Sequence, residues 1–203
     1  MTLAYNPVLE AQPDPVPLHL HRLTVEQYHR MIGAGILHSG DPVELLEGWL
    51  VEKASRSPAH SVCTGLIRRE LEGCLPVGWY VNSKEPITTL DSEPEPDLAV
   101  IMGNPRDYLT HHPFPEQLGL VVEVSDSSLK HDQTLKKRLY ARANVPVYWI
   151  ANLLEMQIEV YSEAQATLES PDYATVQIYR AGEQIPFVLE GQTHLLRVSE
   201  LLP

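Results

Sequence analysis

The stretch "GLVVEVSDSS", residues 119–128, decides the fold and raises the first question about function. Val121, Val122 and Val124 are β-branched and apolar, so the stretch predicts a buried β-strand. Glu123 lies in the middle of that strand. A carboxylate among apolar residues is strongly destabilising unless a positive group meets it. The sequence therefore predicts a cationic partner for Glu123.

Strands and helices surround this stretch in an order typical of a mixed α/β fold. The elements expected before it are a helix after Thr24, a hairpin at 42–51, a helix at 57–75, and strands at 78–83, 84–90 and 96–102. Those expected after it are one helix at 131–145, and strands at 146–153, 156–162, 174–180 and 185–189. We therefore expect helices that flank a central mixed β-sheet, with a β-meander toward the C-terminus.

Composition limits the class of protein. Residues 1–21 are rich in proline and predict a flexible arm, which leaves residues 22–203 as a single domain. No apolar run approaches the roughly 20 residues of a membrane span, and no signal peptide is recognisable, so we expect no membrane partner. Cys63 and Cys74 share one predicted helix but are too far apart to pair, which favours a reducing, cytoplasmic location.

The net charge bears on the partner of the protein. The formal net charge is -12, which argues against broad nonspecific binding of nucleic acid, because such binding needs a basic surface. A local basic patch stays compatible with this charge. Residues 130–142 contain several lysines and arginines and form such a cluster.

A second acid, Glu44, lies in the predicted hairpin "PVELLEGWLV". If Glu47 and Gly48 form a two-residue turn, Glu44 faces Val51 across the ribbon and shares its side with apolar neighbours. Glu44 is therefore placed in apolar surroundings, as Glu123 is.

Asp97 opens the predicted strand "PDLAVIM". Acids on adjacent strands can converge on one divalent cation, and carboxylate oxygens suit Mg²⁺ or Mn²⁺. A nearby lysine would orient or deprotonate a water for attack on a phosphodiester. Asp97 and Glu123 are thus candidate metal ligands that need a lysine beside them.

The helix at 131–145 offers that lysine. Its apolar face is formed by three residues: Leu135, Leu139 and Ala143. At about 100° per residue, Lys136 lies about 60° from the centre of this face and Lys137 about 160° from it. Lys137 therefore points to solvent, and Lys136 lies at the edge of the buried face. We expect Lys136 to be the partner, supported by Asp132 and Tyr140 one turn away.

These segments in this order resemble the PD-(D/E)XK nuclease superfamily and, within it, the Uma-type restriction-endonuclease-like proteins. The resemblance covers residues 22–202, and four segments carry it: "VELLEG", "PDLAV", "LVVEVSDSS" and "DQTLKKRLYARANVPVYWI". It implies a restriction-endonuclease-like core. Glu44 matches the acid of the family's first hairpin, Asp97 the PD aspartate, and Glu123 the (D/E) position.

The chain departs from the common pattern at Ser125, where a lysine is usual. Relatives that lack this lysine carry one on the next helix, and Lys136 matches that position. Lys84 replaces a frequent glutamine and Asp126 a frequent proline. These two changes leave the metal pair intact and bear on the substrate or on the charge of the pocket.

The resemblance implies a Mg²⁺-dependent DNA endonuclease that acts as a homodimer. Asp97 and Glu123 would hold the cation with help from a backbone carbonyl near Val124. Lys136 would orient the attacking water and offset negative charge in the transition state, and Glu44 would complete the metal shell or bind a second ion.

Other interpretations stay open. The chain could be a catalytically silent module that binds nucleic acid or protein on the same fold, or a metal-dependent hydrolase of a small phosphate ester, which the acidic charge favours. Taken singly, Asp97 fits a strand-start acid and Glu123 a buried ion pair. The cluster at 130–142 fits either phosphate contacts or a solvated helix face. His60, near the start of a predicted helix, could border the site, although we favour a capped surface histidine.

Overall fold

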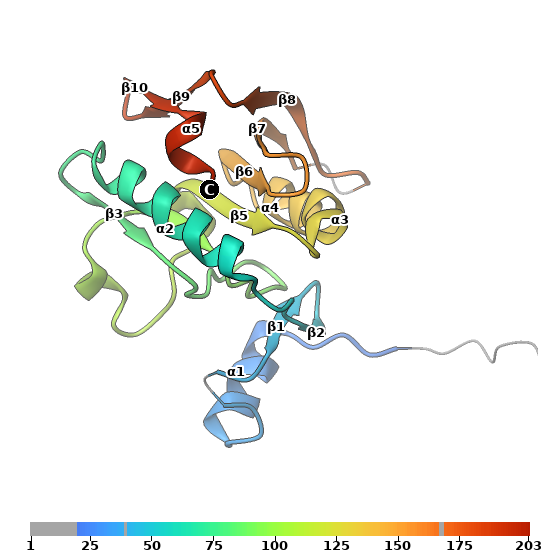
Figure 1. Cartoon of the computed structure of the whole chain (residues 1–203). Helices are drawn as coiled ribbons and strands as arrows, with labels where there is room; N and C mark the ends of the chain where they lie inside the picture. The colour runs from blue at the N-terminus through green and yellow to red at the C-terminus, as the bar shows by residue number, and fades with distance from the viewer. Residues whose placement is uncertain (1–19, 39, 167–168) are drawn as a thin grey trace, which may run out of the picture.

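A six-stranded sheet forms the centre of the computed structural model, which describes residues 20–38, 40–166 and 169–203 (Figure 1). The strand order is β3-β4-β5-β6-β7-β8. Strands β5 and β6 run parallel, and the other neighbouring pairs of this sheet are antiparallel. The predicted mixed sheet is therefore confirmed. Its strands are β3 (Trp79–Asn82), β4 (Leu98–Met102), β5 (Leu118–Ser125), β6 (Val147–Asn152), β7 (Gln157–Gln165) and β8 (Asp172–Arg180).

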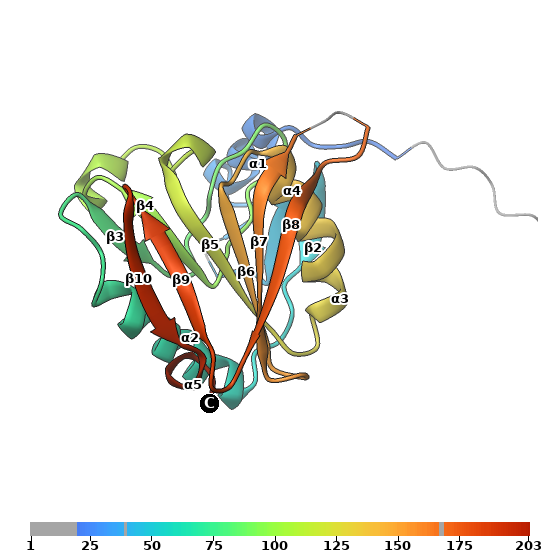
Figure 2. The same ribbon diagram turned by 90° about the horizontal axis from the view of Figure 1, so that it is seen from above.

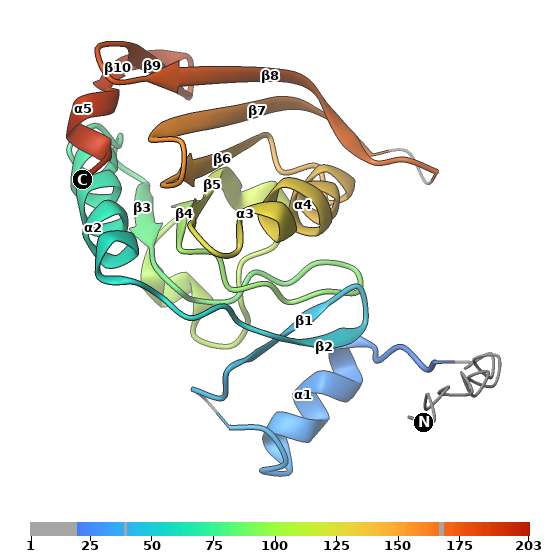
Figure 3. The same cartoon turned by 45° about the vertical axis from the view of Figure 1, so that its right-hand side comes forward.

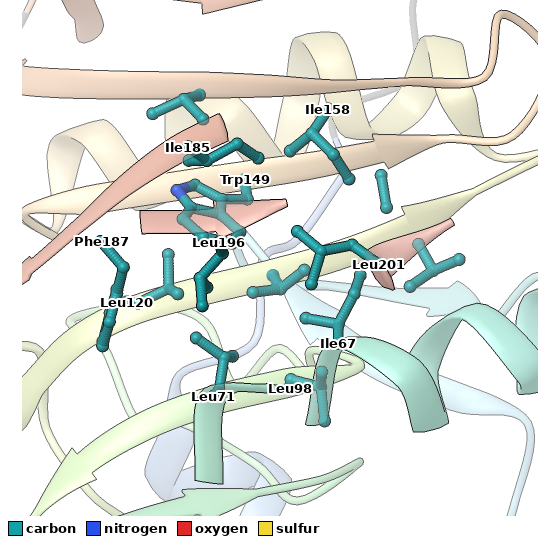
Figure 4. Packing of buried hydrophobic residues seen from close by; sticks show 14 of the residues in the cluster. Ile67, Leu71, Leu98, Leu120, Trp149, Ile158, Ile185, Phe187, Leu196 and Leu201 are labelled. Atoms are coloured by element: carbon teal, nitrogen blue, oxygen red, sulfur yellow. The ribbon is translucent and has the colours of Figure 1, made fainter. Parts of the chain in front are cut away.

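One face of the sheet is covered by two helices and a hairpin. These are α2 (Pro58–Glu72), α5 (Val198–Leu201) and the hairpin of β9 (Gln184–Leu189) with β10 (Gln192–Arg197). In Figure 2, α2 and α5 lie together on one side of the molecule, away from α3 and α4. Figure 4 shows Leu120 of β5 near Leu71 of α2 and Phe187 of β9, with Trp149 of β6 in the same cluster.

The opposite face of the sheet carries the helical segment that follows β5 and the hairpin of β1 (Val43–Leu46) with β2 (Trp49–Glu52) (Figure 3). Side chains alternate along a strand, so Val121 and Glu123 point to this face while Leu120 points to the other. Val121 packs in a cluster with Leu46 of β1 and Leu139 of the helical segment. Glu123 is thereby placed between β1 and that segment.

Two local predictions are confirmed residue by residue. The hairpin pairs Glu44 with Val51 and Leu46 with Trp49. Helix α1 (Val25–Gly33) begins with a capping box, in which Thr24 accepts from the backbone of Gln27 and the Gln27 side chain accepts from the backbone of Thr24. Both features depend on near neighbours, which explains their agreement with the sequence pattern.

The predicted helix at 131–145 is interrupted by a π turn. The segment consists of α3 (Leu129–His131), a π turn at Asp132–Lys136 and α4 (Lys137–Arg142). A π turn has more residues than an α-helical turn, so positions computed for a regular helix do not apply across it. Lys136 is 7% exposed, so it is more deeply buried than a position at the edge of the buried helix face predicts. The prediction for Lys137 was wrong, because its Nζ pairs with Asp172 Oδ1 at 2.9 Å instead of pointing freely to solvent.

Other predicted elements need correction. The strand predicted at 84–90 is absent from the described segment: Pro86 has no N–H, and the backbone N–H groups of Ile87 and Thr89 donate to a nearby loop, to Pro94 and Ser92. Strand β10 was not expected, and β9 pairs with it instead of continuing the meander beyond β8. Cys74 lies just beyond the end of α2, although its thiol and that of Cys63 are free as expected.

Two further predictions concern chain ends and membranes. The proposed arm at 1–21 lies outside the described residues except for Leu20 and His21. Among the described residues, no helix combines the length and apolar character needed to cross a bilayer.

Gly48, in the hairpin turn, is expected to be intolerant of a side chain. Its φ is +80°, and an added Cβ would lie 2.6 Å from the Cβ of Arg22 and 2.9 Å from the carbonyl oxygen of Leu23. We expect Gly48→Ala to lower the free energy of unfolding by roughly 1–3 kcal/mol, measured by urea denaturation. Gly65, in α2, has nothing within 4 Å of an added Cβ. The control Gly65→Ala should therefore raise stability by about 0.5–1 kcal/mol, and equal effects of the two changes would contradict this account.

Candidate active site

The four residues predicted to act together line one pocket of about 260 Å³. Glu44 comes from β1, Asp97 from the residue before β4, Glu123 from β5 and Lys136 from the π turn. The pocket thus lies between the C-terminal end of β5, the β1–β2 hairpin and the helical segment, which Figure 3 shows close together. Other acidic, hydroxyl and basic side chains complete the lining, including Asp126, Asp132, Ser128 and Arg56.

Asp97 is held beside Glu123 by sheet register. Leu98 pairs with Val122 across the antiparallel β4–β5 ladder, so the residue before Leu98 lies opposite the residue after Val122. Asp97 Oδ2 accepts hydrogen bonds from the backbone N–H of Val124 at 2.9 Å and from His60 Nε2 at 3.0 Å. One oxygen of Asp97 is therefore fixed by two donors.

His60 borders the site, which was the less favoured of the two positions that the sequence left open. It is 5% exposed and contacts Asp97, so it is not a surface histidine. The spacing of His60, Thr64, Ile67 and Leu71 follows one face of α2, and all four are buried. That periodicity could have shown that His60 faces inward, although it could not have identified Asp97 as the partner.

Glu123 has the cationic partner that the sequence predicted. Its Oε1 accepts hydrogen bonds from Lys136 Nζ at 2.9 Å and from the Tyr140 hydroxyl at 2.8 Å. Burial raises the pKa of Glu123 to about 8, and the neighbouring Lys136 opposes that rise. Burial also raises the pKa of Tyr140 well above its usual value, so this phenol remains a donor.

Lys136 lies between two carboxylates. In addition to Glu123, Glu44 Oε1 is 3.2 Å from Lys136 Nζ. Burial by itself would lower the pKa of Lys136, but Glu123, Glu44 and Asp132 together raise it well above its usual range. The lysine is therefore protonated at neutral pH, and it acts as a donor and a positive charge rather than as a base.

Ser125 takes part in the site although it replaces the usual lysine. Its hydroxyl donates to Asp132 Oδ2 at 2.6 Å, and Ser128 donates to the same oxygen at 2.6 Å. Burial raises the pKa of Asp132, and Lys136 and the two serines oppose that rise. Ser125 therefore fixes the end of β5 to the π turn that carries Lys136.

The basic cluster at 130–142 is largely engaged within the protein. Arg138 donates two hydrogen bonds to Glu47, at 3.0 and 2.8 Å, and Arg142 pairs with Asp91. These contacts fix α4 to the turn of the β1–β2 hairpin, through Glu47, and to the loop between β3 and β4, through Asp91. The arginines thus help to position Glu44 and Lys136 relative to one another.

The site fits a divalent cation held by two carboxylates. No group of three or more His, Cys, Asp and Glu side chains within the described part of the chain is arranged as a ready metal centre. However, Asp97 Oδ1 and Glu123 Oε2 accept no hydrogen bond from any described residue, whereas the second oxygen of each is fixed. Mg²⁺ usually keeps several waters and is bound through one or two carboxylates.

The charge of the pocket also fits a cation. Four of its acids are buried, namely Glu44, Asp97, Glu123 and Asp132, and Lys136 is the buried lysine among them. Glu44 is less available as a ligand than the other two candidates. Its Oε2 accepts from the backbone of Glu95 at 2.9 Å while its Oε1 faces Lys136.

Comparison with known proteins identifies the family and the fold of the chain. Residues 25–199 match the Uma2 family, which is described as "Putative restriction endonuclease". A similar solved structure is that of "a putative nuclease belonging to DUF820" from Anabaena variabilis ATCC 29413, with 13% identity, a TM-score of 0.67, and coverage of 88% of this chain and 97% of that chain. At this identity the similarity shows the fold. A comparison with curated protein sequences finds no match. The chain therefore belongs to the Uma2 family, on a restriction-endonuclease-like fold.

Proposed function

We propose that the protein is a Mg²⁺- or Mn²⁺-dependent nuclease that hydrolyses DNA phosphodiester bonds. One observation carries this proposal: Asp97 and Glu123 each have one oxygen fixed by two donors and one oxygen left without a hydrogen bond to a described residue, next to the buried Lys136. Membership of the Uma2 family supports the same reaction class.

Each residue of the site would have a separate role in hydrolysis. Asp97 and Glu123 would hold the cation, which supplies Lewis-acid stabilisation of the phosphate oxygens. The ammonium group of Lys136 has three N–H donors. Two of them face Glu123 and Glu44. The third is left for the attacking water or for a phosphate oxygen as negative charge develops. His60 and Tyr140 are positioning residues that keep the two carboxylates in place.

A second candidate function is hydrolysis of a small phosphate ester by the same groups. The net charge of -12 favours it, because an acidic surface repels a long polyanion more than a small ester. A catalytically silent binding module remains the third alternative. The intact set of Asp97, Glu123 and Lys136 in one pocket supports an enzyme over such a module.

One assay separates these candidates. Purified protein is incubated with supercoiled DNA, single-stranded DNA and bis(p-nitrophenyl) phosphate, with Mg²⁺ or Mn²⁺ and with a chelator. We expect DNA cleavage that the chelator abolishes. Turnover of the small ester without DNA cleavage would favour the second candidate. If no substrate is turned over and calorimetry shows no heat of metal binding, the protein is the catalytically silent binding module.

Metal affinity is expected to rise with pH up to about 8. Because burial raises the pKa of Glu123 to about 8, the metal-free protein keeps a proton there at neutral pH, and a cation must displace it. Below pH 8, Mn²⁺ affinity should rise up to about tenfold per pH unit and then level off. Titration calorimetry without DNA measures this. An affinity that is flat from pH 6 to pH 8 would contradict it.

The same pKa shift has a consequence for stability. The folded-state pKa of Glu123 is raised above its ordinary value, so the metal-free folded state binds this proton more tightly than the unfolded chain does. Its stabilising contribution is therefore lost as the pH rises from the ordinary range toward 8. Added Mn²⁺ should offset that loss, which thermal unfolding at several pH values would show.

We also propose that the protein acts as a cytoplasmic homodimer. Strand β8 lies at the edge of the sheet, and its Val176 and Ile178 are 54% and 45% exposed. An edge strand with exposed apolar side chains can pair with a second copy. Light scattering should show a mass that doubles with concentration, and a monomer mass at all concentrations would contradict the dimer.

A further inference from the structure

A second cavity, of about 790 Å³, adjoins the active-site pocket. The two cavities share one wall, which is formed by residues 53–56 and Glu95. The far wall comes mainly from α1, the segment before β1 and the loop after β3. Its apolar members include Tyr28, Ile32, Leu37, Pro42 and Pro86, and polar and charged residues line the rest of it. This volume is typical of sites for small ligands, and the lining combines apolar side chains with several charged ones.

The buried acids of this cavity are engaged within the protein. Glu93 is 2% exposed and accepts hydrogen bonds from His29 Nε2 at 2.7 Å and from the Thr88 hydroxyl at 2.8 Å. Glu95 pairs with Lys53 Nζ at 2.8 Å. Glu85 lies at the rim and is exposed to solvent. Asp41 also lines the cavity, is partly exposed, and accepts a hydrogen bond from the backbone N–H of His38 at 2.8 Å. Apart from Glu85, each of these acids therefore has a partner within the protein.

Arg56, in the shared wall, is not engaged in the same way. Its nearest carboxylate oxygen is Asp97 Oδ1, 3.9 Å from Arg56 Nε, which is too long for a hydrogen bond. The Arg56 side chain is 37% exposed. By contrast, Lys53 and Lys136 are held at 2.8 and 2.9 Å from their partners. The guanidinium of Arg56 is thus a cation at the junction of both cavities whose N–H groups donate to no described residue.

Lys84 adds a second cation to this cavity. It has φ +60°, a left-handed conformation that is unfavourable for a lysine. Its N–H donates to the carbonyl of Pro96 at 3.1 Å, directly before Asp97. No described carboxylate lies within ion-pair distance of its Nζ. The backbone of Lys84 is thus tied to the segment that carries Asp97, while its charge remains available at the cavity.

We infer that the second cavity binds the nucleotide next to the scissile phosphodiester bond. Arg56 contacts the phosphate at the junction of the two cavities, because a planar guanidinium matches the geometry of phosphate oxygens. Lys84 contacts the next phosphate, and the wall around Tyr28 contacts the sugar and the base. This inference rests on the proposed phosphodiester hydrolysis and names the substrate contacts on one side of the bond.

Fluorescence anisotropy of a labelled single strand of eight thymidines tests the inference, with Ca²⁺ in place of Mg²⁺. The variants are Arg56→Gln and Lys84→Asn, since asparagine tolerates the left-handed backbone of residue 84. We expect the dissociation constant to rise about tenfold for Arg56→Gln and at least about threefold for Lys84→Asn. The matched control is Arg68→Gln, in an exposed pair with Glu72 on α2, which should change binding by less than about twofold.

The salt dependence distinguishes a phosphate contact from a purely structural effect. Each lost contact to a single strand should reduce the slope of log K against log salt by about 0.7. Thermal unfolding identifies a variant that has lost its fold, in which case Arg56→Lys replaces Arg56→Gln and should retain part of the affinity. Wild-type affinity and salt slope in both variants would overturn the inference.

The outcomes also separate this inference from the proposed function. If the wild-type protein cuts no DNA but both variants weaken strand binding, the proposed hydrolysis fails while the cavity remains a nucleotide site. If the wild-type protein cuts DNA and both variants bind and cut as it does, the inference about the cavity fails alone.

Discussion

Asp97→Asn is expected to lower metal-dependent DNA cleavage by at least about 1000-fold, or about 4 kcal/mol of transition-state stabilisation. Asparagine has the shape of aspartate, and its carbonyl oxygen can still accept from His60 and from the backbone of Val124. Its amide nitrogen would then face the position of the cation in place of an anionic oxygen. The substitution should therefore remove the metal ligand and leave the fold intact.

Single-turnover nicking of a plasmid measures this effect, and calorimetry with Mn²⁺ follows metal binding in the same samples. The matched control is Glu116→Gln, which removes one negative charge from an exposed residue outside the pocket. The control should cut DNA at the wild-type rate. Asp97→Asn protein that still cuts DNA in a metal-dependent manner would overturn the assignment of the site.

Lys136→Met is expected to lower the free energy of unfolding by about 3–5 kcal/mol in the presence of a chelator at a pH above the raised pKa of Glu123, where this carboxylate is ionised. Methionine fills the space of the lysine stem but leaves Glu123 and Glu44 buried without their cation. The double variant Lys136→Met/Glu123→Gln removes one of these two charges. It should regain a substantial part of the lost stability, because a neutral amide is easier to bury than a carboxylate.

Urea denaturation of the two variants and of Glu123→Gln alone completes a double-mutant cycle. Both proteins that lack Lys136 should fail to cut DNA. The double variant should therefore regain stability without regaining activity. Additive effects of the two substitutions, with no recovery, would show that Lys136 and Glu123 do not interact in solution.

The parts of the structure that the sequence predicts correctly are those set by patterns among residues near one another in the chain. The alternation of residues 119–125 predicts that Glu123 lies on the face opposite Leu120, and the two-residue turn predicts the pairing of Glu44 with Val51. The order of acids and of the basic helix predicts that Asp97, Glu123 and Lys136 share one site, and the structure brings them into one pocket.

Contacts between distant segments account for what sequence reasoning missed. The bond between His60 and Asp97 joins residues on α2 and before β4, and no local pattern links them. The segment at 84–90 has strand-forming residues, but its backbone donors find partners in loops instead of a ladder. The π turn depends on buried partners for Asp132 and Lys136, which only the assembled fold supplies.

The π turn also bears on how such a chain can be found by a motif search. The lysine that reaches Glu123 comes thirteen positions later in the chain, while Ser125 occupies the place where a pattern of fixed spacing expects it. What the carboxylates require is an ammonium group at one point in space, and two different elements can deliver it there. A search that demands a constant interval between the glutamate and the lysine would discard this chain, whereas a search by three-dimensional proximity would retain it.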